Sequence, residues 1–429
     1  MKKMDYQNVK GTQDYLPEAE VIKRKIRQTL ESVFIRYGCK PLETPVLNYT
    51  ELLASKYGGG AEILEEMYTL TDRGERDLAL RYDLTIPFAK VIAMNPNLRM
   101  PFKRYEIGKV FRDGPIKTGR FREFTQCDVD IVGVESQMAE AELMVMAIDT
   151  FKELELDVIV QYNNRNLLTG MLEVFNTPQE NISEVILTLD KLEKIGLEGV
   201  VKELNEKHIP VDTIRSIKQL LSEIDVNELE FFERYAANNV QLKQGMAELK
   251  ELNSFVKFLG IEDRCSFNPF LARGLEIYTG TIYEIFLTDK TVASSIGSGG
   301  RYDNAIAGLI GSDQKFSTVG ISFGLDVIYT AMNIIRQDIA DETSIDYYVI
   351  PINTPKESLL VARSLRQKGF KVEVEMGNKK VGKAMDRANK EGVRQVIIIG
   401  EEEVRNNQFK IKDMSTGDEE IVNFIFQDQ

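Results

Sequence analysis

The pattern of apolar and polar positions divides the chain into stretches of different character. From about residue 18 to 38 apolar residues recur at helical spacing, which predicts a helix ending at Gly38 and then an extended segment, CKPLETPVLNY. Four short β-like stretches follow: MYTLTD, LALRYD, FKRYEIGKVF and FTQCDVDIVG. A long helical run, QMAEAELMVMAIDTFKELE, begins after Glu135. Strands separated by turns and flanked by helices predict an α+β domain built on an antiparallel sheet.

The middle of the chain has a different pattern. Residues 165–252 place Leu, Lys and Glu at helical spacing, as in LTLDKLEKIGLEGVVKELNEK and IRSIKQLLSEI, with few β-branched alternations. We interpret this stretch as a helical insertion that separates residues 1–164 and residues 253–335, the first and second parts of one domain. Strand character returns at LEIYTGTIYEIFL. The glycines of SIGSGGRYDN are interpreted as a tight turn, because glycine adopts backbone conformations that other residues resist.

The C-terminal part alternates strands and helices. Residues 336–344, within the polar stretch RQDIADETSID, are predicted to be a linker. Beyond them DYYVIPI, KVEVEM, VRQVIIIG and QFKIKDM have the pattern of strands, and ESLLVARSLRQKG and GKAMDRANKEG have that of helices. Residues 345–429 are therefore predicted to form a separate small α/β domain with a mixed sheet.

Length and composition agree with this division. A chain of 429 residues is too long for one ordinary core of roughly 100–200 residues, so we expect two or three domains. No apolar run approaches the roughly 18–20 residues that span a bilayer, and the N-terminus lacks the apolar core of a secretory signal. We therefore expect a cytoplasmic protein with no membrane partner.

Charge, histidine and cysteine content limit the chemistry. The net charge of −13 requires any nucleic-acid partner to be bound by local basic patches. The three cysteines lie far apart and form no CxxC pair, which argues against a disulfide framework or a structural zinc site. The single histidine, His208, lies in a polar stretch and is interpreted as a surface residue. Ser-His-Asp hydrolases and most zinc hydrolases are thereby excluded, which leaves chemistry carried by carboxylates, arginines and phosphates.

The segment FRDGPIKTGRFREFTQCDVDIVG, residues 111–133, is the richest in candidate chemistry. On a hairpin, side chains two apart share a face, so Arg120, Arg122 and Phe124 would line one surface. Guanidinium groups suit phosphate oxygens, and an aromatic ring beside them suits a purine. A solvated basic hairpin would carry the same residue types, so this pattern alone leaves both interpretations open.

Three other segments carry weaker candidates. In LALRYDLTIPFAK, Asp83 and Thr85 would share one face of a strand and hold an ammonium group, although such residues end many strands. In LARGLEIYTGTIYE, Arg273 precedes a glycine and Tyr278 follows five residues later. The glycines of SIGSGGRYDN lack the spacing of a P-loop, which excludes that phosphate site.

Together these segments resemble the histidyl-tRNA synthetase family. The match begins at KGTQDYLP and continues through TPVL, LRYDLT, FRDGPIKTGRFREFTQCDVD, LARGLEIYTG and GGRYD. The C-terminal KKVGKAMDRANKEGVRQVIIIGEEE is similar to the family's anticodon-binding domain. The resemblance implies a class II aminoacyl-tRNA synthetase with an antiparallel catalytic sheet, a homodimer interface made by the first helix and strand, and tRNA(His), histidine and Mg²⁺-bound ATP as its partners and substrates.

The resemblance also implies a role for individual residues. Arg112 would hold the ATP α-phosphate, Phe124 would stack on adenine, and Arg120 and Arg122 would lie in the same nucleotide region. The histidine ammonium group would be held by Asp83, Thr85 and Gln126, while Asp130 and Tyr278 would read the imidazole nitrogens. Arg273 would bridge the substrate carboxylate and the α-phosphate, and Tyr302 would close the pocket. Such chemistry needs no protein nucleophile, because positioning and cationic stabilisation of oxyanions suffice.

Three positions depart from the family pattern. In VGISFGLDVI, Val327 stands where the family carries an arginine that contacts the ATP γ-phosphate. Glu276 replaces the family's aspartate, and Ile277 replaces the first of its two tyrosines. One lost charged hydrogen bond is worth roughly 1.5–3 kcal/mol, about a 10- to 100-fold effect on a rate.

Two alternatives to a histidine–tRNA ligase follow from the same resemblance. The first is a non-catalytic paralogue that serves as a regulatory subunit of ATP phosphoribosyltransferase. Such paralogues usually lack the anticodon-binding domain and have eroded catalytic segments, whereas this chain keeps that domain and most of the motif residues. The second is an enzyme that activates histidine for an acceptor other than tRNA.

Overall fold

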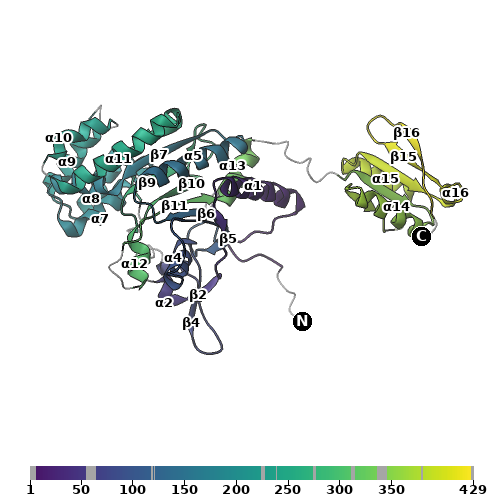
Figure 1. Cartoon of the computed structure of the whole chain (residues 1–429), viewed down its shortest axis with the longest axis horizontal. Coiled ribbons are helices and arrows are strands. Elements are labelled where there is room, and N and C mark those ends of the chain that lie inside the picture. The colour runs from purple at the N-terminus through teal and green to yellow at the C-terminus, as the bar shows by residue number, and fades with distance from the viewer. Residues whose placement is uncertain are drawn as a thin grey trace. The chain divides into compact units, whose positions relative to one another are not determined.

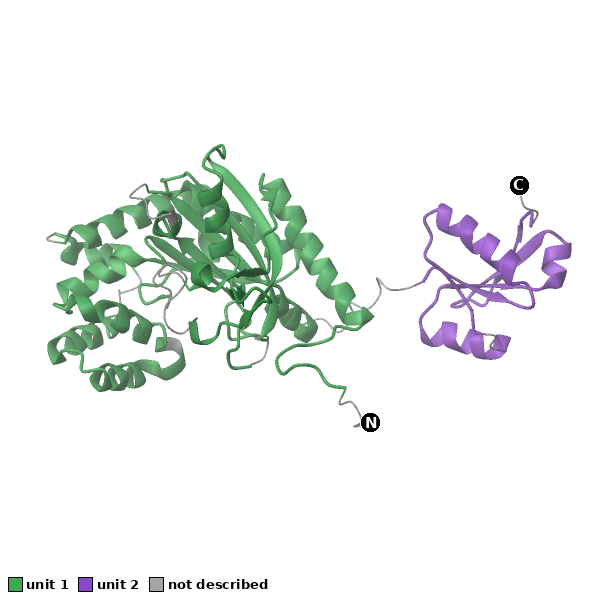
Figure 2. Cartoon of the chain, turned by 90° about the horizontal axis from the view of Figure 1, so that it is seen from below, with its two compact units in different colours: residues 1–336 green, residues 337–429 purple. Residues whose placement is uncertain are grey.

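The computed structural model describes residues 6–54, 64–116, 119, 121–223, 228–237, 239–273, 277–310, 315–335, 345–377 and 380–426. The chain forms two compact units, residues 1–336 and 337–429 (Figure 2). The predicted linker at 336–344 lies outside the described residues. No helix within the described ranges combines the length and the apolar character needed to cross a membrane.

The first part of unit 1 has the predicted order of elements. Its helices and strands are α1 (Pro17–Arg36), β1 (Lys40–Pro41), β2 (Leu47–Tyr49), α2 (Thr50–Leu53), β3 (Thr69–Thr71), β4 (Asp77–Leu80), α4 (Thr85–Met94), β5 (Phe102–Phe111), β6 (Glu123–Val132), α5 (Met138–Glu153) and β7 (Val158–Asn164). Pro17 begins α1 at a position that needs no amide donor, and the helix buries its apolar stripe. Helices α2 and α4 and strand β7 were not predicted.

Residues 165–252 are helical wherever they are regular and described. They form α6 (Arg165–Val174), α7 (Ile182–Leu189), α8 (Leu192–Glu206), α9 (Val211–Leu221), α10 (Glu233–Ala236) and most of α11 (Val240–Phe258). In Figure 1, α7 to α10 lie together beside α11 at one end of the unit. The helices share a core of their own that includes Leu168, Val185, Val200 and Ile217. Contacts divide the chain only into its two units, so the boundaries of the insertion stay a prediction.

The rest of unit 1 completes the sheet. It contains β8 (Cys265–Phe267), β9 (Thr281–Leu287), β10 (Gly297–Arg301), α12 (Asn304–Ile310), β11 (Thr318–Gly324) and α13 (Leu325–Ile335). The prediction that SIGSGGRYDN forms a tight turn is wrong, because its glycines lie in strand β10 at the centre of the sheet. A Cβ on Gly299 would lie 2.1 Å from the Gly320 carbonyl oxygen of β11, so close strand approach explains that glycine.

The main sheet has eight strands in the order β1-β5-β6-β11-β10-β9-β7-β8. The pairings from β5 to β7 are antiparallel, as predicted, whereas β1 and β8 pair in parallel at the two edges. Helices α1 and α5 cover one face, where Phe34 and Phe151 each pack 5.7 Å from the ring of Phe323 on β11. Because side chains alternate along a strand, the residues next to Phe323 point to the opposite face.

Unit 2 is the predicted α/β domain with a mixed sheet. Its elements are β12 (Tyr347–Pro351), α14 (Pro355–Gln367), β13 (Val372–Val374), α15 (Val381–Lys390), β14 (Gln395–Ile399), α16 (Glu401–Arg405), β15 (Gln408–Asp413) and β16 (Glu419–Asn423). The strand order is β13-β12-β14-β15-β16, with the first three strands parallel and the last two antiparallel. Helix α16 and strand β16 were not predicted.

Candidate active site

The face of the sheet opposite α1 and α5 gathers polar side chains at the centre of unit 1. Gln126, Asp128 and Asp130 on β6 are two residues apart and therefore share this face. Across the neighbouring strand β11, Asp128 pairs with Ser322 and Asp130 pairs with Gly320. The sheet therefore presents acidic and amide groups beside a strand of small residues, which leaves space above it.

Two adjoining cavities occupy this space. The acidic cavity, about 50 Å³, is lined by Asp83, Thr85, Asp128, Asp130, Ile277, Tyr278, Ser298, Gly299, Gly300, Tyr302, Gly320, Ile321 and Ser322. The arginine cavity, about 360 Å³, is lined by Arg112, Gly119, Phe124, Gln126, Arg273, Ser294, Ser295, Ile296, Gly297, Ser298, Ser322, Gly324 and Val327. Ser298 and Ser322 line both, so the two cavities meet at these residues.

The cavities bring together residues that the sequence proposed from four separate segments. The acidic cavity contains Asp83, Thr85, Asp130, Tyr278 and Tyr302, and the arginine cavity contains Arg112, Phe124, Gln126 and Arg273. Arg122 lines neither cavity and forms an ion pair with Asp113 at 2.6 Å. Arg120 and Glu276 lie outside the described residues.

Asp83 and Thr85 reach the acidic cavity in a way that the sequence pattern did not predict. They do not share a face of a strand, since β4 ends at Leu80 and Thr85 is the first residue of α4. The Asp83 carboxylate accepts a hydrogen bond from the Ile86 amide at 3.1 Å, as acidic residues do at helix N-termini. Burial raises the pKa of Asp83 to about 6. A cationic ligand would therefore favour its ionised form.

Asp130 is held from two sides. Arg104, which is fully buried on β5, places one guanidinium nitrogen 2.7 Å from Asp130 Oδ2, and the Tyr302 hydroxyl donates to Oδ1. A Cβ on Gly320 would lie 2.0 Å from the same Oδ1, so only glycine leaves room for this carboxylate. Burial raises the pKa of Asp130, while Arg104 lowers it. The carboxylate is thus fixed in the cavity wall, close to Tyr302.

Asp128 was missed, although the alternation along β6 places it between two proposed residues. It is 3% exposed, and burial raises its pKa to about 8. Its Oδ1 has no hydrogen-bond partner within the described part of the chain, and the same holds for Gln126 Oε1. The side-chain nitrogen of Gln126, Nε2, donates to the Ser322 hydroxyl at 3.0 Å. Two buried acceptors at neighbouring positions of one face are therefore open to a donor from a ligand.

The arginine cavity combines two guanidinium groups with an aromatic ring. Arg112 donates to the Tyr82 carbonyl at 3.0 Å, and its guanidinium carbon lies 5.3 Å from the centre of the Phe124 ring. Arg273 forms an ion pair with Glu284 of β9 at 2.5 Å and lies 5.6 Å from the centre of the Tyr278 ring. Glu284 was not proposed from the sequence, where nothing distinguishes it from other strand carboxylates. Its contact orients Arg273, whose charge then lies at the cavity wall.

Asp326, at the start of α13, ties the N-terminal segment to β6. This buried carboxylate accepts hydrogen bonds from the Tyr15 hydroxyl at 2.8 Å, from Lys23 at 2.6 Å and from the Thr125 amide at 2.7 Å. Gly11 lies against Arg122 and accepts a hydrogen bond from its amide at 2.8 Å. The segment KGTQDYLP therefore supports the strand that carries Phe124 and Gln126.

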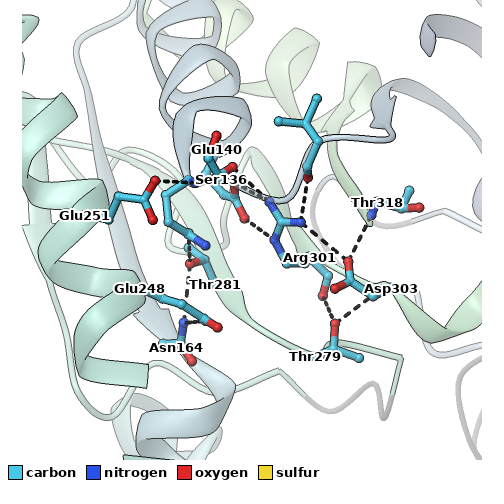
Figure 3. Close-up of polar contacts among 12 residues, drawn as sticks. Ser136, Glu140, Asn164, Glu248, Glu251, Thr279, Thr281, Arg301, Asp303 and Thr318 are labelled. Carbon is cyan, nitrogen blue, oxygen red and sulfur yellow. Dashed lines mark hydrogen bonds and ion pairs between the residues drawn. The ribbon is translucent and has the colours of Figure 1, made fainter. Parts of the chain in front are cut away.

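The GGRYD segment is anchored by a buried arginine (Figure 3). Arg301 donates to Glu140 of α5 at 2.6 and 2.8 Å and to the Val134 carbonyl at 2.9 Å. Asp303 lies 3.6 Å from the same guanidinium and accepts the Thr318 amide at 2.9 Å. Tyr302 lies between these two anchored residues. The network therefore fixes the residue that contacts Asp130.

Val327 lines the arginine cavity in the first turn of α13. A Cβ on Gly119 or Gly324 would lie 3.5 or 3.4 Å from its side chain, which is ordinary contact. The position thus presents an apolar surface to the cavity. The described residues supply two cations to this lining, Arg112 and Arg273.

Comparison with known proteins settles the family. A family model described as histidyl-tRNA synthetase matches residues 11–328, and one described as an anticodon binding domain matches residues 346–425. The chain belongs to the histidyl-tRNA synthetase family. The synthetases of this family are aminoacyl-tRNA ligases. The two family models and a similar solved structure of a family member also confirm the predicted class II catalytic fold with a separate anticodon-binding domain.

Individual relatives of the synthetase family agree over nearly the full length. The histidine–tRNA ligase 2 of Shouchella clausii is 59% identical over 426 residues, 99% of this chain and 100% of that protein. The crystal structure of histidyl-tRNA synthetase from Nostoc sp. PCC 7120 has a TM-score of 0.82 at 30% identity, and the match covers 98% of this chain and 97% of that one. The crystal structure of an ATP phosphoribosyltransferase regulatory subunit/histidyl-tRNA synthetase from Bacillus halodurans C has a TM-score of 0.76. The match covers 93% of this chain and 100% of that one. At 19% identity it shows the fold alone.

The Lys and Arg residues near positions 379–394 of unit 2 are the candidates that the sequence offers for contacts with the anticodon. Lys383, Lys390 and Arg394 are exposed on or after α15, whereas Lys379 lies outside the described residues. Arg387 is engaged within the unit, with Glu373 and Glu391 both at 2.8 Å. The exposed cations suit phosphate contacts, and they equally suit a solvated helix face. Their role stays a prediction.

Proposed function

We propose that this protein is a histidine–tRNA ligase, which activates histidine with ATP and transfers it to the 3′ end of tRNA(His). The observation that carries the proposal is the junction of an acidic cavity and an arginine cavity at Ser298 and Ser322. An amino acid with its side chain in the first cavity would present its carboxylate to a nucleotide in the second. The histidine–tRNA ligase named among the relatives supports this assignment.

The roles of the residues follow from this placement. In the acidic cavity Asp130 and Tyr278 would read the imidazole nitrogens, and Tyr302 would close the pocket. The ammonium group would be held by Asp83 and Thr85 of this cavity and by Gln126 of the arginine cavity. A site built for both ring nitrogens rejects an amino acid that leaves those buried partners unpaired. Binding therefore selects histidine by the groups that it satisfies.

Adenylate formation takes place where the cavities meet. The histidine carboxylate attacks the α-phosphorus of ATP, and pyrophosphate leaves. Arg273 would bridge the carboxylate and the α-phosphate, Arg112 would hold the α-phosphate, and Phe124 would stack on adenine. Oriented reactants and fixed cations lower the barrier without a protein nucleophile. Arg120 and Arg122 remain proposed members of the same nucleotide region.

Mg²⁺ is proposed to accompany ATP. The described residues include no group of three or more His, Cys, Asp or Glu side chains placed to hold a metal. Mg²⁺ prefers oxygen ligands and commonly binds through substrate phosphates and water, with one or two carboxylates. The serine hydroxyls that line the arginine cavity provide oxygen donors. The cation would neutralise charge on the phosphates as pyrophosphate leaves.

The partners of the enzyme are also proposed. Unit 2, matched by the anticodon-binding model, would contact tRNA(His) through local basic side chains, since the whole chain carries a net charge of −13. A homodimer would form through the first helix and strand, where Ile35 of α1 is 56% exposed. We propose a cytoplasmic location, where tRNA is charged.

Neither alternative is favoured by a specific observation. The regulatory-subunit alternative expects eroded catalytic segments, whereas nine of the proposed residues meet in two adjoining cavities and unit 2 is present. The alternative with a different acceptor makes the same adenylate. Charging assays with radiolabelled histidine separate these possibilities. We expect label on tRNA that ends in an intact 3′ adenosine and none on oxidised tRNA; adenylate formation with no transfer to any tRNA would support the other acceptor.

Gly320→Ala is expected to impair histidine binding. The added methyl group would overlap Asp130 Oδ1 at 2.0 Å and crowd the Tyr302 ring at 3.2 Å. Overpacking of this kind costs about 1–3 kcal/mol, so the histidine KM should rise about 5- to 100-fold. Gly324→Ala is the matched control on the same strand, because its new methyl group meets nothing closer than 3.4 Å. Equal histidine KM values for the two variants would contradict the placement of the substrate's imidazole ring near Asp130.

Val327→Arg is expected to improve the use of ATP. The new guanidinium would enter the arginine cavity, where the family pattern places a γ-phosphate contact. A gained charged hydrogen bond of roughly 1.5–3 kcal/mol would raise kcat/KM for ATP about 10- to 100-fold. Val327→Met adds length without charge and should leave that parameter near the wild-type value. A fall in kcat/KM for both variants would show that other groups already fill this position.

A further inference from the structure

Asp128 is a buried carboxylate that forms no ion pair with any cation among the described residues. The neighbouring carboxylates each have a close partner: Asp130 lies 2.7 Å from Arg104, and Glu106 lies 2.8 Å from Arg81. Ser322 lowers the pKa of Asp128 slightly, and the Asp128 Oδ1 has no hydrogen-bond partner in the described ranges. Arg104 lowers its pKa only from a distance, and burial outweighs that effect. A ligand cation would supply the missing charge.

The position of Asp128 in the sheet indicates which part of the substrate it faces. Its cross-strand partner is Ser322, and Ser322 pairs in turn with Ser298. These two serines are the residues that line both cavities. Asp130, by contrast, pairs with Gly320, and Gly320 lines only the acidic cavity. Asp128 therefore lies near the junction, where the α-carbon end of an amino acid would be placed.

The open acceptors near this junction match an ammonium group better than a ring. Gln126 Oε1 and Asp128 Oδ1, on the same face of β6, both lack partners within the described residues. Asp83 also lines the acidic cavity and is close enough to Asp128 to raise its pKa. An ammonium group has three N–H donors and a full charge, whereas a neutral imidazole has one N–H donor. The three N–H donors of an ammonium group can thus be matched by Gln126 Oε1, Asp128 Oδ1 and the Asp83 carboxylate.

We propose that Asp128 forms an ion pair with the α-ammonium group of the bound amino acid, beside Asp83 and Gln126. This inference rests on the function proposed above and adds a residue that the family resemblance did not assign. It makes Asp128 a substrate-binding residue that recognises the ammonium group. The ring contacts of Asp130 and Tyr278 are independent of it.

The ion pair couples histidine binding to proton release. Burial raises the pKa of Asp128 to about 8 in the free protein, so the carboxyl group is mostly protonated at about pH 7. An ammonium group at Oδ1 favours the ionised form and lowers that pKa, so binding expels a proton and histidine affinity rises as the pH approaches 8. The charged or titratable groups that face Asp128 are Asp83, Arg104, Asp130, Tyr278 and Tyr302, with Glu106 as its cross-strand neighbour on β5.

Asp128→Asn tests the ion pair with little change in shape. The probe pair is histidine and imidazolepropionate, which lacks the ammonium group but keeps the ring and the carboxylate. Histidine KM and the inhibition constant of imidazolepropionate are measured by pyrophosphate exchange on the full-length protein. For Asp128→Asn we expect histidine KM to rise about 10- to 100-fold, while the imidazolepropionate constant and the ATP KM change less than about threefold. An equal loss for both probes, or no loss for either, would overturn the proposal.

Calorimetry supplies a second readout that a structural role would not move. Histidine binding is titrated at about pH 7 in two buffers of different ionisation enthalpy, which gives the number of protons released. The wild-type protein should release a proton fraction that Asp128→Asn loses. Release that persists unchanged in the variant would assign the proton to another group and contradict the inference. A wild-type protein that neither binds nor activates histidine would instead refute the proposed function, so the two failures are distinguishable.

Discussion

Arg273→Ala is expected to lower kcat/KM for histidine-dependent pyrophosphate exchange by about 10³-fold or more. Arg273 is the cation of the arginine cavity that lies beside Tyr278 of the acidic cavity, and it would bridge the substrate carboxylate and the α-phosphate. Removing one preorganised donor to a developing oxyanion costs roughly 10²–10³ in rate. A bridging charge that also orients both reactants should cost at least as much.

The control for this variant separates catalysis from folding. Arg273 is 19% exposed and its partner Glu284 is 18% exposed, so water can reach the carboxylate that the substitution leaves behind. Arg273→Ala should therefore melt within a few degrees of the wild-type protein. Arg273→Lys keeps the charge but loses the planar fork, and it should retain intermediate activity. Near-normal exchange by Arg273→Ala would refute the assigned role.

Glu140→Ala is expected to destabilise unit 1 by about 3–5 kcal/mol. Glu140 is fully buried, and both of its oxygens accept hydrogen bonds from Arg301, which is 4% exposed. Removing one member of a buried ion pair leaves the other charge without compensation. The midpoint of chemical denaturation should fall accordingly, and activity should fall with it because Tyr302 adjoins Arg301.

The double variant Glu140→Met/Arg301→Met provides the control. Replacing a buried ion pair by apolar side chains of similar volume is often neutral, so the double variant should recover much of the stability that Glu140→Ala loses. Full recovery is not expected, since Arg301 also donates to the Val134 and Ser136 carbonyls. A Glu140→Ala protein as stable as the wild type would show that the network in Figure 3 contributes nothing to folding.

Most of the fold was predictable because the main elements have clear periodicity. Helices α1 and α5 bury regular apolar stripes, and β5 and β6 are long strands. The error at SIGSGGRYDN has a physical cause. Glycine is common in turns, but here it fills β10 because neighbouring backbone leaves no room for a Cβ. Local propensity cannot reveal that crowding, which arises from strands distant in sequence.

The candidate site was predictable through resemblance more than through local chemistry. Asp83 and Thr85 reach the cavity from the start of α4, although their spacing suggested a strand. Asp128 escaped notice because a carboxylate on a strand has no distinguishing sequence pattern until its neighbours are known. Glu284 was missed for the same reason. Long-range packing therefore decides which polar residues of the sheet belong to the site.

The most direct test of the function is pyrophosphate exchange into ATP, measured with the purified full-length protein and each of the twenty amino acids in turn. The account predicts exchange that depends on histidine and is at least about 10²-fold slower with every other amino acid, since those leave the buried partners of the imidazole ring unpaired. Exchange that is equally fast with several amino acids, or absent with histidine, would contradict it.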